Sequence, residues 1–469
     1  MGNIINSYIF PHPPIIVPEV GKGEEKGAEK TLNAVKKAAE EIRNDRPTTI
    51  ILTTPHGPVF QDYVYISDEE NLAGNLSRFG AGNVKLSFVN NTDLVSSIIT
   101  YAAEEGIYSG GLPEDVAKKY KITKELDHGA LIPLYFIGKE LQNFKLVHIA
   151  IAGLPFIDLY RFGRCIAKAV ENSDENVVFV ASGDMSHRLT NEAPYGYSEK
   201  GKIFDDILIE SIKNVDIERL LSIDEHLCEE AGECGLRSFI MMFGALDGYD
   251  IKPEVYSYEG PFGVGYSIAK IAKSQQNDKR RILKIIGEKD SAKLKELRAN
   301  EDVYVALARN SLETYVRENR IIRPDKDLPS EIMENSAGTF VSIKKHGQLR
   351  GCIGTISPTR ENIAQEIIYN AISAGTRDPR FNPIEENELQ SLVYSVDVLK
   401  EAEPIDSIKE LDTVRYGVIV KKGRKSGLLL PNLEGVDTPE EQVSIALQKA
   451  GISPNEDYRM ERFEVIRHK

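Results

Sequence analysis

The sequence predicts an α/β protein of two domains, in which a mainly parallel sheet flanked by helices precedes a smaller α+β domain. The chain has 469 residues, which is too long for one hydrophobic core of ordinary size. Before residue 272, apolar strand-like runs alternate with amphipathic helical segments, the pattern of a parallel sheet covered on both faces. Beyond a charged stretch, helices and antiparallel hairpins follow, which indicates a separate α+β domain.

Strands of the first domain are predicted from short apolar or β-branched runs. We expect them at Asn6–Phe10, Thr48–Thr54, Lys145–Ala152 and Val177–Ser182. Helical periodicity covers Glu24–Arg43 and Tyr160–Asn172, and residues 201–247 are mostly helical. Residues 256–266 read as a strand and a Gly-rich turn, without the strand-to-helix spacing of a nucleotide-binding loop.

A polar, strongly charged segment at about residues 272–300 is predicted to be a linker that runs into a helix. We therefore place the domains at 1–277 and 278–469. In the second domain we expect two hairpins, one of them turning at Lys345-His346 and the other across residues 423–426, with a strand at Leu392–Leu399. Helices are predicted at Val303–Glu318, Glu361–Ala374 and Thr438–Ala450.

The composition is that of a globular protein, with 41% hydrophobic and 28% charged residues. A net charge of −14 argues against non-specific binding of nucleic acid or of a membrane surface by the first domain. The four cysteines show neither CxxC pairing nor zinc-finger spacing, which favours a reducing compartment. The N-terminus lacks a signal-peptide pattern, and no apolar stretch has the ~20 residues of a membrane span. We expect a cytoplasmic protein without a membrane partner.

Polar residues follow three of the predicted strands. His12 lies in FPHPP and His56 in TTPHG, where prolines stiffen the loop, and His187 follows the strand VVFVAS in the sequence SGDMSH. Because open α/β sheets carry their chemistry at the carboxyl ends of the strands, we expect His12 and His56 to share one site. Asp184 and Ser186 are expected to orient His187.

Two neutral imidazoles and one anionic ligand would make a metal site with open positions for substrate and O₂. The anionic ligand could come from the segment CEEAGECGLR, at Glu229, Glu230, Glu233 or Cys234. The first two of these acids are explained by the preference of a helix N-terminus for acids, so Glu233 and Cys234 are the stronger candidates. His187 is a candidate ligand, acid/base or core residue, and its ordinary pKa of ~6.5 suits proton transfer. His128, beside Asp127, is either a further site residue or a polar residue at a helix start.

The second domain has one cysteine-containing motif, QLRGCIGT. Cys352 could be a nucleophile, but no nearby His/Asp pattern would activate it, so a small buried side chain is the stronger interpretation. The loop TRDPRF and the first arginine of QLRGCIGT could form an anion-binding corner or a salt-bridged one. Its residues are Arg350, Arg377, Asp378 and Arg380.

The motifs PHPP, TTPHG, DHG and SGDMSH resemble those of LigB-type class III extradiol ring-cleavage dioxygenases and of the related Memo-like proteins, over residues of about 5–272. The resemblance implies that His12, His56 and a glutamate nearer the C-terminus hold non-haem Fe(II). It also implies that His187 acts as acid/base and that His128 helps to bind substrate or O₂. Cys234 aligns where Memo-like proteins have a cysteine and ring-cleavage enzymes a glutamate, so Glu233 and Cys234 stay alternatives for the third ligand.

The motifs LRGCIG, RDPRF and GLLLP resemble the AMMECR family, over residues of about 290–469. The fusion of the two domains is similar to the AmmeMemoRadiSam system, which implies a radical S-adenosylmethionine protein as a partner. This chain has no CxxxCxxC iron–sulfur motif, so that activity would belong to the partner.

We therefore expect a metal-dependent oxidoreductase of the extradiol dioxygenase type, with Fe(II), or zinc or another divalent metal, on His12, His56 and Glu233 or Cys234. Its substrates would be O₂ and a catechol-like or other chelating small molecule, and His187 would move the proton. The second domain would present a substrate or partner through Arg350, Cys352 and the segment Arg377–Arg380. The alternative is a non-catalytic metal-binding or interaction protein whose second domain docks a partner or binds RNA.

Overall fold

The computed structural model describes all residues except His346 and Glu434, so the predicted turn at Lys345-His346 lies partly outside the described residues. The chain forms two compact units, Met1–Ile286 and Gly287–Lys469. Helix α11 (Ile282–Ala299) contains the boundary between them. The charged segment at 272–300 comprises the end of a strand, a short 3₁₀ turn and this helix.

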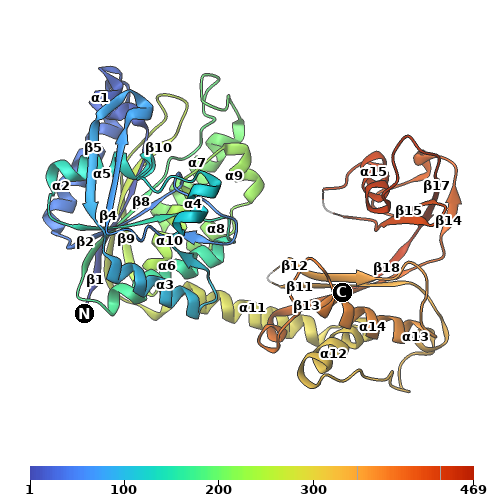
Figure 1. The fold of residues 1–469 in the computed structure, drawn as a ribbon. Helices are drawn as coiled ribbons and strands as arrows, with labels where there is room; N and C mark the ends of the chain where they lie inside the picture. The colour runs from blue at the N-terminus through green and yellow to red at the C-terminus, as the bar shows by residue number, and fades with distance from the viewer. Residues whose placement is uncertain (346, 434) are drawn as a thin grey trace. The chain divides into compact units, whose positions relative to one another are not determined.

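The first unit is built on a six-stranded sheet in the order β7-β2-β8-β1-β10-β9 (Figure 1). Strands β7, β2, β8 and β1 are parallel, and β10 and β9 extend the sheet as an antiparallel hairpin. The strands are β1 (Asn3–Phe10), β2 (Thr49–Thr54), β7 (Lys145–Ala150), β8 (Asn176–Ser182), β9 (Tyr249–Glu259) and β10 (Tyr266–Gln276). The predicted class, a parallel-rich sheet with flanking helices, is confirmed.

Successive side chains of each parallel strand point to opposite faces of the sheet, so the core is divided between the two faces. Ile51 and Phe179 belong to one buried cluster, whereas Leu52 and Val180 belong to the other. The first cluster packs against α3 (Thr92–Glu104), α6 (Phe156–Glu171), α7 (Glu199–Asn214) and α10 (Leu236–Ala245). The second packs against α2 (Glu29–Asp45) and α5 (His128–Glu140). Helices cover both faces of the sheet, which explains why every residue of β2 is buried, its threonines included.

Smaller elements surround the carboxyl edge of this sheet. A hairpin formed by β4 (Asn71–Leu76) and β5 (Ala81–Val89) has the 3₁₀ turn η3 (Ser77–Phe79) at its bend. Helix α4 (Glu114–Tyr120) precedes α5, and α9 (Glu225–Ala231) precedes α10. The hairpin was not predicted, because its sequence NLAGNLSRFGAGNVKLSFV is rich in Gly and Asn and lacks a regular apolar pattern.

The second unit contains two four-stranded sheets, which confirms the predicted α+β class. One has the order β12-β11-β13-β18, with β11 (Thr339–Lys345), β12 (Gln348–Gly354), β13 (Leu392–Leu399) and β18 (Val465–His468). Its apolar face packs against α12 (Val303–Glu318), α13 (Ser330–Glu334) and α14 (Ile363–Thr376). The other has the order β14-β17-β15-β16, with β14 (Glu403–Ile405), β15 (Gly417–Lys422), β16 (Lys425–Leu429) and β17 (Arg459–Phe463), and packs against α15 (Pro439–Ala450).

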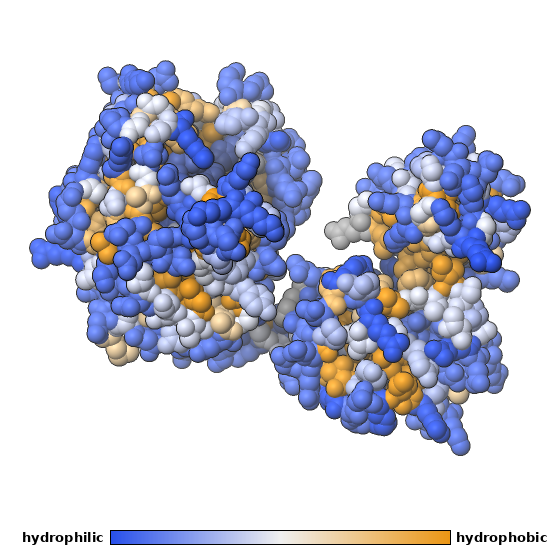
Figure 2. Space-filling view, in the orientation of Figure 1, coloured by the Kyte–Doolittle hydropathy of each residue, from blue (hydrophilic) through white to orange (hydrophobic). Residues whose placement is uncertain are grey.

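The visible surface is mostly hydrophilic, with apolar side chains in small groups (Figure 2). Among the described residues, no helix combines the length and the apolar character that crossing a membrane requires.

Candidate metal centre

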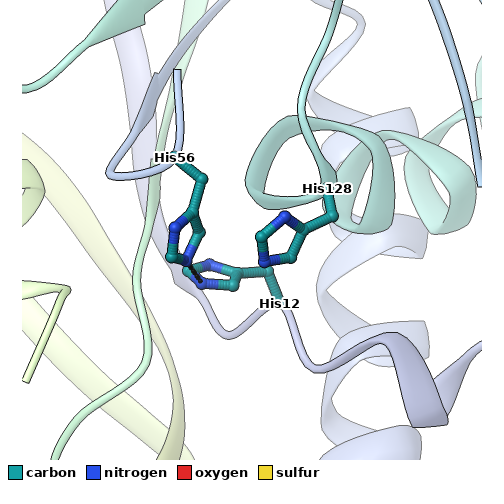
Figure 3. Close-up of side chains that lie close together, drawn as sticks. All are labelled: His12, His56 and His128. Carbon is teal, nitrogen blue, oxygen red and sulfur yellow. Dashed lines mark hydrogen bonds between the residues drawn. The ribbon is translucent and has the colours of Figure 1, made fainter. Parts of the chain in front are cut away.

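Three histidines meet at the carboxyl edge of the first sheet. His12 follows β1, His56 follows β2, and His128 is the first residue of α5. Their imidazole rings point toward one another (Figure 3), and one nitrogen from each ring lies within 4.8 Å of the other two. The structure therefore brings His12 and His56 together and adds His128 to them.

The distances within this histidine cluster suit a single bound ion. The Nε2 atoms of His12 and His56 are 3.0 Å apart. Two imidazole nitrogens that bind one ion at ~2.0–2.1 Å, with a near-tetrahedral or near-octahedral angle between them, would be about 3 Å apart. His56 and His128 stack with ring centroids 4.2 Å apart, and the ring of His12 stands nearly perpendicular to both.

Hydrogen bonding at Nδ1 of His12 determines which ring nitrogen carries the proton. The Ser182 hydroxyl donates its only proton to the carbonyl of Gly129 at 2.6 Å. Toward Nδ1 of His12, 2.9 Å away, the same hydroxyl can therefore only accept. In neutral His12 the proton is on Nδ1 and the lone pair of Nε2 faces the other two histidines, which is the tautomer of a metal ligand.

The electrostatics of the cluster keep its imidazoles neutral. Burial lowers the pKa of His12, His56 and His128; together with charge on a neighbouring imidazole it outweighs Asp127 and Asp184, and the pKa of each histidine falls to about 4. Neutral imidazole is the form that binds metal ions. At neutral pH the three rings are therefore ready to coordinate without losing a proton.

Asp184 connects this cluster to His187. One carboxylate oxygen accepts from the backbone N–H of His12 at 2.8 Å. The other lies 3.9 Å from His12 Nε2 and 3.8 Å from His187 Nε2. Nδ1 of His187 donates to the carbonyl of Gly232, which turns Nε2 toward Asp184. Burial lowers the pKa of His187, but the Asp184 carboxylate and the Gly232 carbonyl outweigh it and raise that pKa above its ordinary value.

Of the two candidates for an anionic ligand, Cys234 is next to the cluster and Glu233 is engaged elsewhere. Cys234 Sγ lies 3.7 Å from His12 Nε2, and burial raises the pKa of this thiol far above its usual range. Glu233 accepts from the backbone N–H of Leu236 at 2.8 Å, at the start of α10, and burial raises its pKa to about 7. Neither belongs to the set of three described residues whose ligand atoms lie within 4.8 Å of one another.

The sequence interpretation placed Glu229 and Glu230 at the start of a helix, and this prediction is wrong. They lie in the last turn of α9, which ends at Gly232 in the left-handed conformation, and α10 starts only at Leu236. The segment CEEAGECGLR therefore contains the end of α9 and the start of α10, with a break between them. A glycine with φ of 62° permits this break.

A buried pair beneath the cluster, Asp127 and His148, was missed by the sequence interpretation. Asp127 caps α5, accepts from Thr54 Oγ1 at 2.7 Å and lies 3.2 Å from His148 Nε2. Burial opposes ionisation, but these hydrogen bonds hold the pKa of Asp127 well below its usual range. The pair fixes the start of α5 and with it the position of His128. The sequence feature that could have indicated this pair is His148, a histidine inside the otherwise apolar strand KLVHIA.

A cleft of about 620 Å³ opens onto His56 and His128. Its wall includes Arg78 and Phe79 of η3, and the Phe79 ring lies 5.3 Å from that of His128. The volume falls within the ~300–1,000 Å³ of small-molecule sites. A ligand in this cleft would reach the cluster directly.

Comparison with known proteins agrees with this geometry. The family model described as the catalytic LigB subunit of aromatic ring-opening dioxygenase matches residues 6–269. The chain belongs to the LigB family. A second model, AMMECR1, matches residues 305–468. The protein is thus a LigB domain fused to an AMMECR1 domain.

The same fusion is matched along its whole length by a protein of Clostridium acetobutylicum, 48% identical over 464 residues and 98% of both chains. A Thermotoga maritima protein is 50% identical over 171 residues, which cover 36% of this chain and 98% of that protein. Among solved structures, an uncharacterized Pyrococcus horikoshii protein is 33% identical and covers 35% of this chain and 88% of its own, with a TM-score of 0.33. An uncharacterized Escherichia coli protein is 12% identical, with coverage of 57% and 99% and a TM-score of 0.40.

In the AMMECR1 domain, most of the predicted corner is salt-bridged. Arg350 donates twice to Glu388, at 3.0 and 2.8 Å. Asp378 accepts from Arg380 and from the backbone N–H of Cys352. Arg377 is exposed at the end of α14. These contacts connect the TRDPRF loop to the LRGCIG strand.

Cys352 accepts a hydrogen bond from the Ser342 hydroxyl at 3.2 Å. Burial raises the pKa of the thiol, which keeps it protonated at neutral pH. A protonated thiol is a poor nucleophile, so the structure favours the interpretation of Cys352 as a packed side chain.

Proposed function

We propose that the LigB domain binds a divalent metal ion through His12, His56 and His128, and that it acts as an oxidoreductase of the class III extradiol dioxygenase type on a small chelating molecule. The observation that carries the proposal is the cluster of three imidazole nitrogens within 4.8 Å, in which the lone pair of His12 Nε2 faces the other two rings. Imidazole ligands suit Fe(II), zinc and other divalent ions, and we propose Fe(II).

In this proposal His128 takes the third position, in place of Glu233. The Glu233 carboxylate already accepts from the start of α10, whereas the His128 ring stacks on His56. Cys234, 3.7 Å from His12 Nε2, is the nearest thiol and a candidate for a further ligand. The donor set is therefore richer in nitrogen than the two-histidine, one-carboxylate arrangement of many non-haem iron oxygenases.

A bound metal ion would supply Lewis acidity and open positions for O₂ and for the oxygen atoms of a catechol-like substrate. The protein supplies the proton handling: His187, held by Gly232 and facing Asp184, would accept a substrate hydroxyl proton and later return it. Asp184 would hold the backbone of His12 in place and stabilise the imidazolium of His187.

A second candidate function is metal binding without catalysis. The observation that favours it is Cys234, which lies beside the cluster where a carboxylate ligand was expected from ring-cleavage enzymes. In either case we propose that the AMMECR1 domain docks a partner through the surface around Arg350 and Arg377–Arg380. The partners we propose are a radical S-adenosylmethionine protein or, alternatively, RNA.

Metal analysis of the full-length protein, purified without oxygen and supplied with Fe(II), tests the proposal. We expect about one ion per chain, and its loss in His12→Ala and His56→Ala. His128→Ala should lower the affinity for the metal by about 10-fold or more, because it removes one of three ligands and losing even a hydrogen-bond partner of a ligand histidine costs that much. The exposed His226 on α9 provides the control His226→Ala, which should bind normally.

Catalysis is tested separately, by catechol-dependent O₂ uptake. We expect uptake in the loaded protein and its loss in His187→Ala with the metal retained. Full loading without uptake across a panel of catechols would instead favour metal binding without catalysis. Failure to bind any divalent metal would refute both candidates.

A further inference from the structure

A groove separate from the cleft beside the histidine cluster runs along β5, and we call it the β5 groove. Two adjoining cavities, of about 410 and 630 Å³, share the lining residues Ser87, Phe88, Leu141 and Gln142, so they form one continuous groove. No described residue lines both this groove and the cleft beside the histidines. All of residues 83–89 line the groove. Because successive residues of a strand point to opposite faces, a groove lined by all of them follows the edge of the strand.

The edge of β5 that faces this groove has no strand partner. Among the described strands, β5 pairs only with β4, in a two-stranded sheet. Ala73 of β4 is opposite Ser87, and its carbonyl accepts from the backbone N–H of Leu126 at 2.9 Å. This carbonyl therefore points away from β5, and in an antiparallel pair the N–H and C=O groups of the opposite residue point outward as well.

Lys85 and Ser87, two residues apart on one strand, therefore direct their backbone N–H and C=O groups into the β5 groove. Neither of the two N–H groups has an acceptor among the residues that the structure describes. An unpaired strand edge of this kind is a template for the backbone of another extended chain.

The floor of the β5 groove is apolar. Leu86 and Phe88 are half-buried and pack against the core that the hairpin shares with α5. The centroid of the Phe88 ring lies 5.2 Å from that of Phe144. In the wall formed by α5, a Cβ added at Gly138 would meet nothing within 4 Å, so this wall leaves room for a ligand. An extended chain along the edge would place every second side chain on apolar surface.

Basic side chains outnumber acidic ones in the lining of the β5 groove. The acidic residue is Glu19, whose carboxylate already accepts from the Tyr135 hydroxyl at 2.6 Å. The basic residues are Arg46, Lys85, Lys139 and Lys145. This local excess of positive charge, on a chain with a net charge of −14, favours a negatively charged ligand. A second copy would bring a groove of the same charge to this edge, which disfavours self-association here.

We propose that the β5 groove binds an extended segment of a partner protein by β-strand addition, and that this segment alternates apolar residues with Asp or Glu. Its backbone exchanges hydrogen bonds with Lys85 and Ser87, which supplies affinity. Its apolar side chains lie on Leu86 and Phe88, and its acidic side chains lie beside the exposed Lys85. The interaction uses no residue of the histidine cluster, so it is independent of the proposed metal binding.

A synthetic peptide tests the proposal with the full-length protein. A fluorescein-labelled peptide of Glu-Val repeats, blocked at both ends, is titrated and followed by fluorescence anisotropy. We expect it to bind about 10-fold more tightly than a Lys-Val peptide of equal length, because the groove is basic. The Glu-Val peptide N-methylated at every residue should bind about 10-fold more weakly than the unmodified one, because it cannot donate hydrogen bonds to the edge of β5.

Substitutions on β5 locate the site. Ser87→Pro removes a backbone donor from the free edge without breaking a hydrogen bond to β4, and it should weaken binding of the Glu-Val peptide about 10-fold. Ser87→Ala is the matched control, since it keeps the backbone donor and should bind normally. Lys85→Glu should reverse the preference between the Glu-Val and Lys-Val peptides.

The proposal is overturned if the Glu-Val peptide shows no saturable binding, if the methylated peptide binds equally well, or if folded Ser87→Pro binds normally. Thermal unfolding shows whether Ser87→Pro is folded. If it is not, Lys85→Glu, at an exposed side chain, and the methylated peptide decide the question. Sedimentation velocity tests the other occupant of the edge. A dimer of the parent protein that Ser87→Pro converts to monomer would assign the edge to a second copy, which would overturn the proposal as well.

Discussion

The hydroxyl group of Ser182 determines the tautomer of His12. Ser182, at the last position of β8, connects the carbonyl of Gly129 in α5 to Nδ1 of His12 after β1. Three elements of the first sheet and its helix layer thus meet in one chain of hydrogen bonds. Ligand histidines in proteins are generally oriented by such a second partner, which fixes the tautomer.

Replacing Ser182 with Ala should therefore weaken metal binding although Ser182 itself does not contact the ion. We expect a loss of about 10- to 100-fold in affinity, the usual effect of removing a partner of a ligand histidine. A metal titration of the two proteins measures this. The matched control is Ser267→Ala in β10, where a buried hydroxyl has no hydrogen-bond partner among the described residues. Equal losses in the two variants would contradict this role of Ser182.

A residue-scale effect on stability is expected in the AMMECR1 domain, at Glu388. Burial raises the pKa of this carboxyl, but Arg350 and Lys345 outweigh it and lower the pKa to about 2. A depressed pKa stabilises the fold above the ordinary pKa, and this stabilisation is lost as the pH falls from about 4.5 to about 2. Allowing for solvent screening of this partly exposed pair, we expect about 2 kcal/mol at neutral pH.

Urea unfolding from pH 7 to pH 3 tests this expectation. Glu388→Gln should lower the free energy of unfolding at pH 7, and the difference from the parent should shrink below pH 4.5. The exposed neighbour Glu386 provides the control Glu386→Gln, which should change little. A difference that stays constant down to pH 3 would show that the ion pairs contribute nothing measurable.

At the scale of elements, the site depends on the close approach of β8 to α10. Gly183 follows β8 and Gly235 precedes α10, and a Cβ added at Gly183 would lie 2.2 Å from the Cα of Gly235. Only a residue without a side chain permits this contact. The approach brings Asp184 and Cys234 together, so that the Asp184 backbone N–H donates to Cys234 Sγ at 3.4 Å.

Gly183→Ala should push these two elements apart. We expect a destabilisation of about 1–3 kcal/mol, typical of overpacking, together with weaker metal binding. Thermal unfolding and a metal titration measure the two effects. Gly138→Ala, in α5 where an added Cβ meets nothing within 4 Å, should be neutral or stabilising by roughly 0.5–1 kcal/mol. An unaltered metal affinity in Gly183→Ala would show that the cluster does not depend on this contact.

At the scale of the whole molecule, the protein consists of two units with separate cores. The buried clusters of Met1–Ile286 surround the six-stranded sheet, and those of Gly287–Lys469 surround two smaller sheets. The histidine cluster belongs to the first unit alone. A ligand that binds only one unit stabilises that unit by mass action.

Scanning calorimetry of the full chain should therefore show two unfolding transitions, of which the metal raises only one. At a free metal concentration of 100 times Kd, the stabilisation should be about 2.7 kcal/mol. His12→Ala should abolish the shift and leave the other transition in place. Two transitions that rise together on metal addition would contradict this independence.

The sequence determined the α/β class, the order of the parallel strands along the chain and the presence of His12 and His56 after two of them. These features follow from local patterns: apolar runs predict strands, and prolines and glycines mark where the runs end. Because parallel strands place their carboxyl ends on one edge, two histidines far apart in sequence could be expected to share a site. Neither the Asn- and Gly-rich hairpin that carries Arg78 nor the break at Gly232 followed from such patterns.

The tertiary structure decided which side chains complete the site. His128 joins the cluster because Asp127, fixed by Thr54 and His148, sets the start of α5. Glu233 is occupied at the start of α10, while Cys234, one residue later, lies beside His12. Adjacent residues separate in this way because a side chain's direction depends on where a helix begins and how it packs on the sheet. Those long-range contacts leave no periodic signal in the sequence.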